Sequence, residues 1–249
     1  MQPQEIYDAK FYQQQKNISV QAARKFLALL FSHYIPQSVL DIGCGSGSWL
    51  KVAQDLGAKT VLGIDGNKVE QDELYLPRNC IESVDLNEIL SGQTQSQILT
   101  DNPHFDLAMS LEVAEHLPET ASRSLVDLLT QKTDVVLFSA ALPHQDGCHH
   151  INCQNVDYWV NFFHGKGYIC IDMFRPTFMF DDSLTAWWYG QNAFLYVKQS
   201  VMGSFPSLKK YESNHPMSFY HEYIVNRLVD PETSLGYRIE RKLRKWLKL

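Results

Sequence analysis

Apolar and polar positions along the chain follow two periods, one typical of helices and one typical of buried strands. Residues 5–34 carry apolar side chains at helical spacing, and Pro36 ends the segment. The residues that set this spacing are Val20, Ala23, Phe26, Leu27, Leu30 and Phe31. Short apolar runs of strand length follow, namely SVLDI, TVLGID, CIESVD, FDLAMSL, DVVLFSAAL, YICIDMF and QNAFLYVK.

Helical patterns separate several of these runs, and their order predicts the fold class. The run VVLF within residues 134–142 is apolar on both faces, as in a strand buried inside a parallel sheet. Strands that alternate with helices predict an α/β fold with a doubly wound, Rossmann-like sheet. An aromatic-rich insertion at 175–190 separates the last two strands, and Phe178 and Phe180 are expected to pack there.

The same pattern divides the chain into three parts. We expect a helical N-terminal segment at 1–35, an α/β domain at 36–199 and a helical C-terminal extension at 200–249. The last stretch, GYRIERKLRKWLKL, is typical of a basic amphipathic helix. It is expected to pack on its own domain or on a second subunit in a homodimer, with an anionic membrane or an acidic partner as the alternative.

Composition and charge restrict the kinds of binding partner and the cellular compartment that the sequence favours. The 249 residues carry a net charge of −6, which argues against a long nucleic acid as partner, because phosphate recognition needs a basic face. The 5 cysteines form no CxxC pair, which favours a reducing compartment, and the N-terminus lacks the features of a signal peptide. No apolar stretch approaches the roughly 20 residues that span a bilayer. These features predict a cytoplasmic protein without a transmembrane segment.

A glycine-rich turn follows the first strand in the motif DIGCGSG, which contains Asp41, Gly43, Gly45 and Gly47. Glycines allow a tight turn into a helix and a close approach of a ligand to the backbone. The dinucleotide pattern GxGxxG has a glycine where this chain has Ser48. Asp41 would repel a diphosphate, but it suits S-adenosylmethionine (SAM), which carries an ammonium and a sulfonium. The turn therefore predicts a SAM site rather than a nicotinamide site.

Further residues expected to bind SAM follow the next two strands. Asp65, with Gly66 beside it, is expected to accept hydrogen bonds from both ribose hydroxyls. Asp85 ends the expected third strand, where it is expected to meet the adenine amino group while Leu86 packs on the ring. The backbone near Leu111, at the end of the fourth strand, completes the expected donor site.

The chain resembles the class I SAM-dependent methyltransferases from about residue 36 to residue 197. It is similar in particular to bacterial small methyltransferases that carry an EVAEHLP segment, here 112–118, and a later QxGxxHxN…YW segment, here 145–159. The resemblance implies a seven-stranded, mostly parallel sheet with the last strand antiparallel, and SAM as the methyl donor. It points more loosely to a small-molecule or sugar acceptor.

Three histidines lie on loops at the expected carboxyl edge of the sheet, namely His116, His149 and His150. Histidine is the natural base for an acceptor hydroxyl near neutral pH, and His150 is favoured because it occupies the HxN position of the resembled group. Glu112 joins the histidines on the acceptor side, and methyl transfer to oxygen is expected. The expected substrate-binding residues are Asn152, Tyr158, Arg175 and Trp188.

A metal site is the alternative at the same place. Glu112, Glu115 and His116 form ExxEH, and His150 could complete a set that suits Mg²⁺, Mn²⁺ or another first-row metal. This pattern resembles the small-RNA 3′-terminal 2′-O-methyltransferases, so a metal-assisted RNA 2′-O-methyltransferase is the second interpretation. We expect a metal-free enzyme. The third interpretation is a SAM-binding protein without catalysis.

Overall fold

The computed structural model describes residues 9–229 of the chain. Its strands are β1 (Ser38–Ile42), β2 (Thr60–Asp65), β3 (Ile81–Ser83), β4 (Leu107–Leu111), β5 (Val135–Ser139), β6 (Tyr168–Ile171) and β7 (Phe194–Lys198). Its helices are α1 (Ala9–Phe31), α2 (Ser48–Asp55), α3 (Leu86–Leu90), α4 (Gln97–Asp101), α5 (Glu119–Lys132), α6 (Val156–Gly165), α7 (Arg175–Phe178), α8 (Trp187–Asn192) and α9 (Glu222–Val229). Short 3-10 helices are η2 (Gln71–Glu73), η3 (Arg78–Cys80), η4 (Ala114–His116), η5 (Gln199–Ser204) and η6 (Pro206–Tyr211).

The strands form one sheet in the order β3-β2-β1-β4-β5-β7-β6. The first five strands are parallel, and β7 lies antiparallel between β5 and β6. The predicted doubly wound, seven-stranded sheet is therefore confirmed. The strand order reverses between β1 and β4, and ligands of open α/β sheets bind at the carboxyl ends of strands beside such a reversal.

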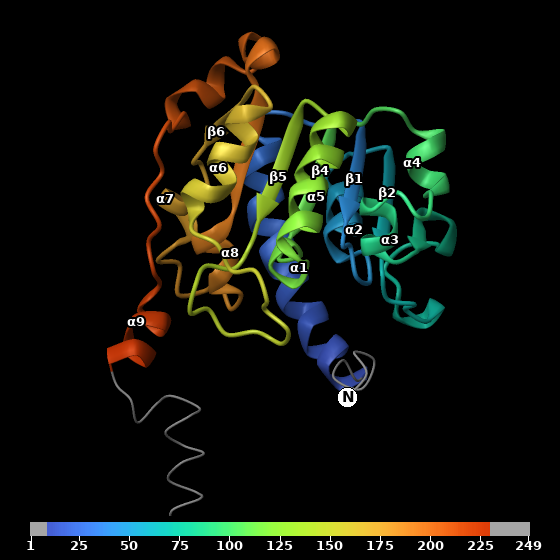
Figure 1. Ribbon diagram of the computed structural model, residues 1–249, viewed down its shortest axis with the longest axis horizontal. Coiled ribbons are helices and arrows are strands. Elements are labelled where there is room, and N and C mark those ends of the chain that lie inside the picture. The colour runs from blue at the N-terminus through green and yellow to red at the C-terminus, as the bar shows by residue number, and fades with distance from the viewer. Residues whose placement is uncertain (1–8, 230–249) are drawn as a thin grey trace, which may run out of the picture.

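Helices cover both faces of the sheet (Figure 1). On one face α1, α2, α7 and α8 pack in a core that receives Val135 and Leu137 of β5. On the other face α5 and α6 pack in a second core that receives Val136 and Phe138 of the same strand. Successive residues of β5 thus point to opposite cores, which explains why its sequence is apolar throughout.

Helix α1 belongs to the core of the α/β unit. Its side chains Ala22, Ala23, Phe26, Leu27 and Leu30 are completely buried, as their spacing predicts. The Phe26 ring stacks on the rings of Phe178 in α7 and of Phe174 just before it. It also meets the ring of Trp49 in α2 edge to face. The N-terminal helix is therefore joined to the sheet by a continuous apolar contact.

Two local predictions were wrong. The third strand was expected to end at Asp85, but β3 ends at Ser83 because Asp85 caps α3 instead, accepting a hydrogen bond from the Asn87 amide at 2.8 Å. Phe178 packs as expected, whereas the Phe180 side chain is 84% exposed because it follows the last turn of α7. The aromatic insertion that contains both residues folds into the short helices α7 and α8.

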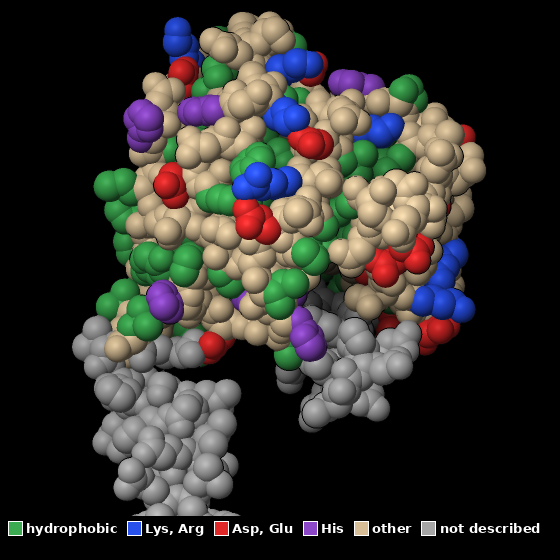
Figure 2. Space-filling view, viewed as in Figure 1, with side chains coloured by type: hydrophobic (Ala, Val, Ile, Leu, Met, Phe, Trp, Pro, Cys, Tyr) green, Lys and Arg blue, Asp and Glu red, His purple; other side chains and the backbone are tan. Residues whose placement is uncertain are grey.

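Three further expectations concern the surface charge, a membrane-spanning segment and the C-terminal helix. On the face shown in Figure 2, acidic and basic side chains are interspersed rather than gathered by sign. Among the described residues, no helix is both long and apolar enough to cross a bilayer. The predicted basic helix at the C-terminus lies outside the described residues.

Candidate active site

The glycine-rich turn joins β1 to α2 through three left-handed residues. Gly43, Gly45 and Gly47 have φ angles of +84°, +54° and +80°, which side chains other than glycine rarely adopt. The amides of Gly43 and Cys44 donate to the Ile64 carbonyl at 2.8 and 3.2 Å, which ties the turn to the end of β2. The sequence expectation of a tight strand-to-helix turn at this motif matches this geometry.

Two buried carboxylates lie at this turn. Asp65 accepts hydrogen bonds from the amides of Gly45 at 2.7 Å and Asn67 at 2.8 Å. Burial, followed by the charge of Asp65, raises the pKa of Asp41 to about 8. Burial also raises the pKa of Asp65, although the amides of Asn67 and Gly45 oppose the shift. A cationic ligand beside this pair would favour its ionised form.

The other residues expected to bind SAM differ in their position and burial. Leu111 is the last residue of β4, the strand next to β1, and it is buried. Gly66 directly follows Asp65 and has open space where a side chain would lie. Asp85 is exposed as the cap of α3, and Leu86 is buried in the core on the α5 side.

The segment after β4 packs directly on the glycine turn. A Cβ atom added to Gly43 would lie 2.2 Å from Cγ2 of Val113, so only a glycine allows this contact. Glu112, the residue before Val113, has a φ of +56°, which is unusual for a residue with a side chain. The turn and the acceptor-side segment are therefore one packed unit.

Glu112 is held by a group of hydrogen-bonded carboxamide side chains, and we call Gln145, Gln191 and Asn192 the carboxamide network. Gln145 Nε2 and Asn192 Nδ2 donate to the Glu112 carboxylate at 3.0 and 3.1 Å. Asn192 also donates to Gln145 Oε1 at 2.9 Å, and Gln191 donates to Asn192 Oδ1 at 2.9 Å. Gln191 Oε1 in turn accepts from the His221 amide at 2.6 Å. This network fixes the orientation of Glu112, and its hydrogen bonds were not predicted from the sequence.

The loop after β5 brings His150 beside His116. The amides of Ile151 and Asn152 both donate to the Glu115 carbonyl, at 2.9 and 3.0 Å. The Asn152 side chain then donates to Ser122 Oγ at 2.8 Å, which anchors the loop to α5. As a result, the two imidazole rings lie 4.9 Å apart, edge to face. Asn152, expected to bind substrate, thus positions His150.

Both imidazoles favour their neutral form. Burial, followed by the neighbouring charge of His150, lowers the pKa of His116 to about 4, although backbone carbonyls of His149 and Cys148 oppose the shift. Burial also lowers the pKa of His150, with the Gln145 carbonyl opposing. Each ring therefore offers a nitrogen lone pair near neutral pH.

Glu115 lies beneath the two histidines, and we call Glu115, His116 and His150 the Glu–His cluster. One side-chain donor atom of each lies within 4.8 Å of the others. Burial raises the pKa of Glu115 well above its usual value, and the charge of Glu112 raises it further. Of the four residues in the metal alternative, three thus come together, while Glu112 is held by the carboxamide network.

The whole fold and this site can now be compared with known proteins. A family described as a methyltransferase domain matches residues 14–194, which is most of the chain. The chain belongs to this family of class I, SAM-dependent methyltransferases. The match begins inside α1, in agreement with the packing of that helix into the core. None of the curated proteins matches the chain.

Solved structures of methyltransferases share the fold. Magnesium protoporphyrin IX methyltransferase from Synechocystis PCC 6803 with bound SAH has 16% identity and a TM-score of 0.50 over 73% of this chain and 84% of that one. The methyltransferase domain of bacterial CtHen1 has 18% identity and a TM-score of 0.51 over 73% and 98%. A SAM-dependent methyltransferase from Archaeoglobus fulgidus has 16% identity and a TM-score of 0.50 over 72% and 93%. Identities this low establish the fold alone.

Several residues expected on the acceptor side of this methyltransferase lie elsewhere. The Tyr158 hydroxyl donates to Glu119 at 3.1 Å, which joins α6 to α5. Arg175 is buried, its guanidinium is paired with Asp172, and the ring of Phe194 lies 4.4 Å away. These side chains have structural partners, and the structure does not bring them to the Glu–His cluster.

Of two other expected residues, His149 adjoins the Glu–His cluster and Trp188 packs on the hydrophobic core. His149 is exposed with a φ of +56°, and it adjoins the cluster through its backbone. Trp188 is half-buried against the core on the α1 side, with its ring 5.9 Å from that of Tyr189. Tyr189 is buried near Glu112, whose charge contributes to the raised pKa of the Tyr189 hydroxyl.

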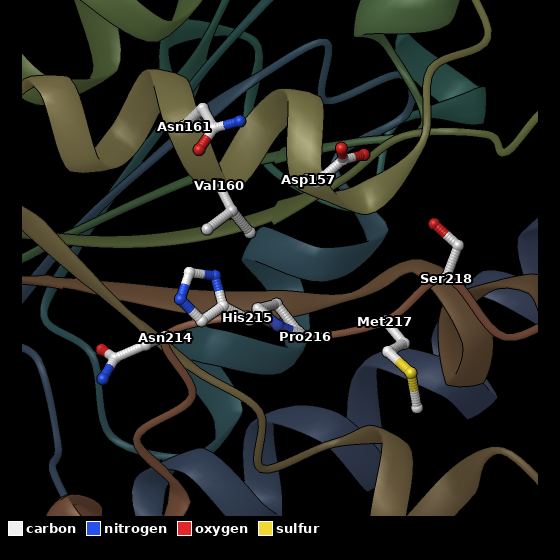
Figure 3. A pocket seen from close by; sticks show the side chains of 8 residues that line it. All are labelled: Asp157, Val160, Asn161, Asn214, His215, Pro216, Met217 and Ser218. Carbon is white, nitrogen blue, oxygen red and sulfur yellow. The ribbon is translucent and has the colours of Figure 1, made fainter.

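A cavity of about 310 Å³ lies between α6 and the segment 214–218 (Figure 3). Its lining side chains are Asp157, Val160, Asn161, Asn214, His215, Pro216, Met217 and Ser218. None of these residues belongs to the glycine turn, the carboxamide network or the Glu–His cluster. The lining of the cavity therefore shares no residue with these three groups.

Proposed function

We propose that this methyltransferase moves the methyl group of SAM to an oxygen of a small molecule or a sugar. The observation that carries the proposal is the pair of neutral imidazoles, His116 and His150, on the segments that pack beside the glycine turn. A hydroxyl acceptor must lose its proton, and a neutral imidazole accepts a proton at near-neutral pH. Glu112, held in place by the side chains of Gln145 and Asn192, offers a fixed acceptor for a hydrogen bond from the same substrate.

The donor is assigned to the glycine turn. Asp41 and Asp65 form a buried acidic pair that suits the ammonium and sulfonium charges of SAM. The left-handed residues from Gly43 to Gly47 let the ligand approach the backbone closely, and Asp65 retains lone pairs for ribose hydroxyls. One structure of similar fold contains SAH, which supports the same assignment here.

The reaction is a displacement at the methyl carbon. The acceptor oxygen forms a bond to that carbon while the carbon–sulfur bond breaks, and the electron pair stays on sulfur to give a neutral thioether. The hydroxyl proton passes to His150. The protein supplies alignment of the two substrates and the proton acceptor, which together account for large rate enhancements.

The proposal is tested in two steps. Calorimetric titration with SAM and SAH is expected to show one site per chain. A survey of hydroxylated small molecules, sugars, amines and RNA 3′ ends, with SAM labelled in the methyl group, is then expected to label oxygen acceptors of low molecular weight. Absence of SAM binding, or labelling confined to amines or RNA, would contradict the proposal.

The glycine turn offers a direct prediction for donor binding. In Gly43→Ala the new Cβ would be held at a left-handed φ, at a cost of about 1–2 kcal/mol, and would collide with Val113. We expect SAM affinity to fall roughly tenfold or more, measured by calorimetry. Gly203→Ala, whose Cβ would meet no atom within 4 Å, is the matched control and should bind SAM normally. Adding Val113→Ala should recover part of the affinity, and unchanged affinity in Gly43→Ala would disprove the role of this turn.

A further inference from the structure

Exposed apolar side chains are concentrated in one short part of the described chain. Nine large apolar side chains are exposed among the described residues, and five of them lie between residues 217 and 228. We call these five the apolar edge, namely Met217, Phe219, Tyr223, Val225 and Leu228. Single exposed apolar residues are ordinary, whereas a concentration of this kind marks an interaction surface.

The fold holds the apolar edge in place. Arg175, which is buried, donates a hydrogen bond to the Met217 carbonyl, and its guanidinium lies 5.2 Å from the Phe219 ring. In α9 the side chain of Ile224 is only 1% exposed, whereas those of Val225 and Leu228 are 41% and 56% exposed. Val225 and Leu228 are three residues apart, so they share one face of the helix. Figure 2 shows hydrophobic side chains gathered at the lower left, where α9 lies in Figure 1.

The sequence that follows the apolar edge is rich in positive charge. Residues 236–249, which lie outside the described residues, contain six basic side chains and one acidic side chain, although the whole chain carries a net charge of −6. Apolar residues recur among them at helical spacing, namely Ile239, Leu243, Trp246 and Leu247. Apolar side chains combined with clustered Lys and Arg are what an anionic lipid surface attracts.

This combination distinguishes a lipid surface from the other occupants. Packing of the extension on its own domain is disfavoured, because Ile224 is the only buried side chain among those described in α9. A second copy of the chain would bring the same positive charges together across a two-fold axis, which opposes association. A nucleic acid would engage the basic residues but would leave the apolar edge in water.

We propose that the apolar edge and residues 236–249 together bind the surface of a membrane that contains anionic phospholipids. The apolar side chains enter the boundary between headgroups and acyl chains, and the basic side chains lie at the lipid phosphates. The Tyr220 hydroxyl lies 3.3 Å from Asn155 Oδ1, so this surface adjoins the loop between β5 and α6. The docked protein thus has the carboxyl edge of its sheet near the lipid. The inference goes beyond the proposed function and does not depend on it.

The test measures vesicle binding by the full chain. Sedimentation is compared between vesicles of phosphatidylcholine alone and vesicles of phosphatidylcholine mixed with phosphatidylglycerol. We expect binding to the anionic vesicles to be tighter by about tenfold or more and to weaken as salt is added. Combining Val225→Ser with Leu228→Ser should weaken it roughly tenfold. Combining Arg241→Gln, Lys242→Gln and Lys245→Gln should weaken it about 100-fold.

Two matched controls separate this surface from general hydrophobicity and charge. Ile35→Ser replaces an apolar side chain that is 52% exposed before β1. Combining Arg24→Gln, Lys59→Gln and Lys209→Gln removes the same amount of charge from three exposed positions elsewhere. Both controls should bind the anionic vesicles like the unchanged protein. Thermal unfolding checks that every variant is folded.

Several outcomes overturn the inference. Equal binding to both kinds of vesicle, or none to either, excludes an anionic lipid surface. Unchanged binding after the Val225 and Leu228 substitutions removes the apolar edge from the interaction. A dimer in sedimentation equilibrium that dissociates in the same variant would assign the edge to a second copy instead. Tight binding of an RNA oligonucleotide without vesicle binding would assign the basic residues to nucleic acid.

Discussion

Replacing His150 by alanine is expected to lower kcat by about 100-fold or more while SAM affinity stays unchanged. The imidazole of His150 lies 4.9 Å from that of His116, and none of the backbone hydrogen bonds described for its loop reaches the glycine turn. On the proposed mechanism, removing it takes away activation of the acceptor and leaves the glycine turn intact. Turnover is measured with an oxygen acceptor found in the labelling survey, and SAM binding by calorimetry.

The control for this variant is His164→Ala, which deletes an imidazole on the outer surface of α6 and should keep full turnover. A His150→Ala enzyme with normal kcat would show that His150 neither accepts the proton nor holds a metal. If kcat falls only in the presence of added metal, the residue acts through the ion. If it falls equally in EDTA, the residue acts as the base.

Replacing Phe26 by alanine is expected to lower the free energy of unfolding by about 3–5 kcal/mol. The ring is completely buried, with its centroid 4.5 Å from that of Phe178, 5.1 Å from Phe174 and 6.0 Å from Trp49. The surrounding rings come from α2, α7 and its flank, and they cannot collapse into the vacated space without moving helices that also contact the sheet. Urea unfolding followed by tryptophan fluorescence measures the loss.

Phe180→Ala is the matched control, because the same side chain is 84% exposed there and its removal should change stability by less than about 0.5 kcal/mol. A small effect of Phe26→Ala would mean that α1 is dispensable to the core. That result would contradict the continuous packing seen between α1 and the sheet.

The sheet and the conformation of the glycine turn were predictable from sequence because both rest on local rules. Apolar runs such as that of β5 can be buried only inside a sheet covered on both faces, and the DIGCGSG motif needs left-handed residues at its glycines. The helical spacing around Phe26 likewise predicted a buried face. In each case a few neighbouring residues determine the conformation without reference to distant segments.

The arrangement of the segments after β4 and β5 was less predictable because it depends on long-range partners. His116 and His150 were expected on adjacent loops, but the hydrogen bonds that the Ile151 and Asn152 amides donate to Glu115 cannot be seen in a pattern of residue types. Arg175 was expected to bind substrate, and its buried pairing with Asp172 depends on the packing of the last strands. Asp85 was misplaced because a strand end and a helix cap look alike when both precede a leucine.

The hydrogen bond from the His221 amide to Gln191 has a consequence for the C-terminal segment. If residues 218–229 detach from the domain, the buried oxygen of Gln191 loses its donor, and the carboxamides that hold Glu112 lose their outermost support. The attachment of this segment and the orientation of Glu112 are therefore thermodynamically coupled. A substrate that engages Glu112 tightens the attachment of the segment by the same amount that the attached segment strengthens substrate binding.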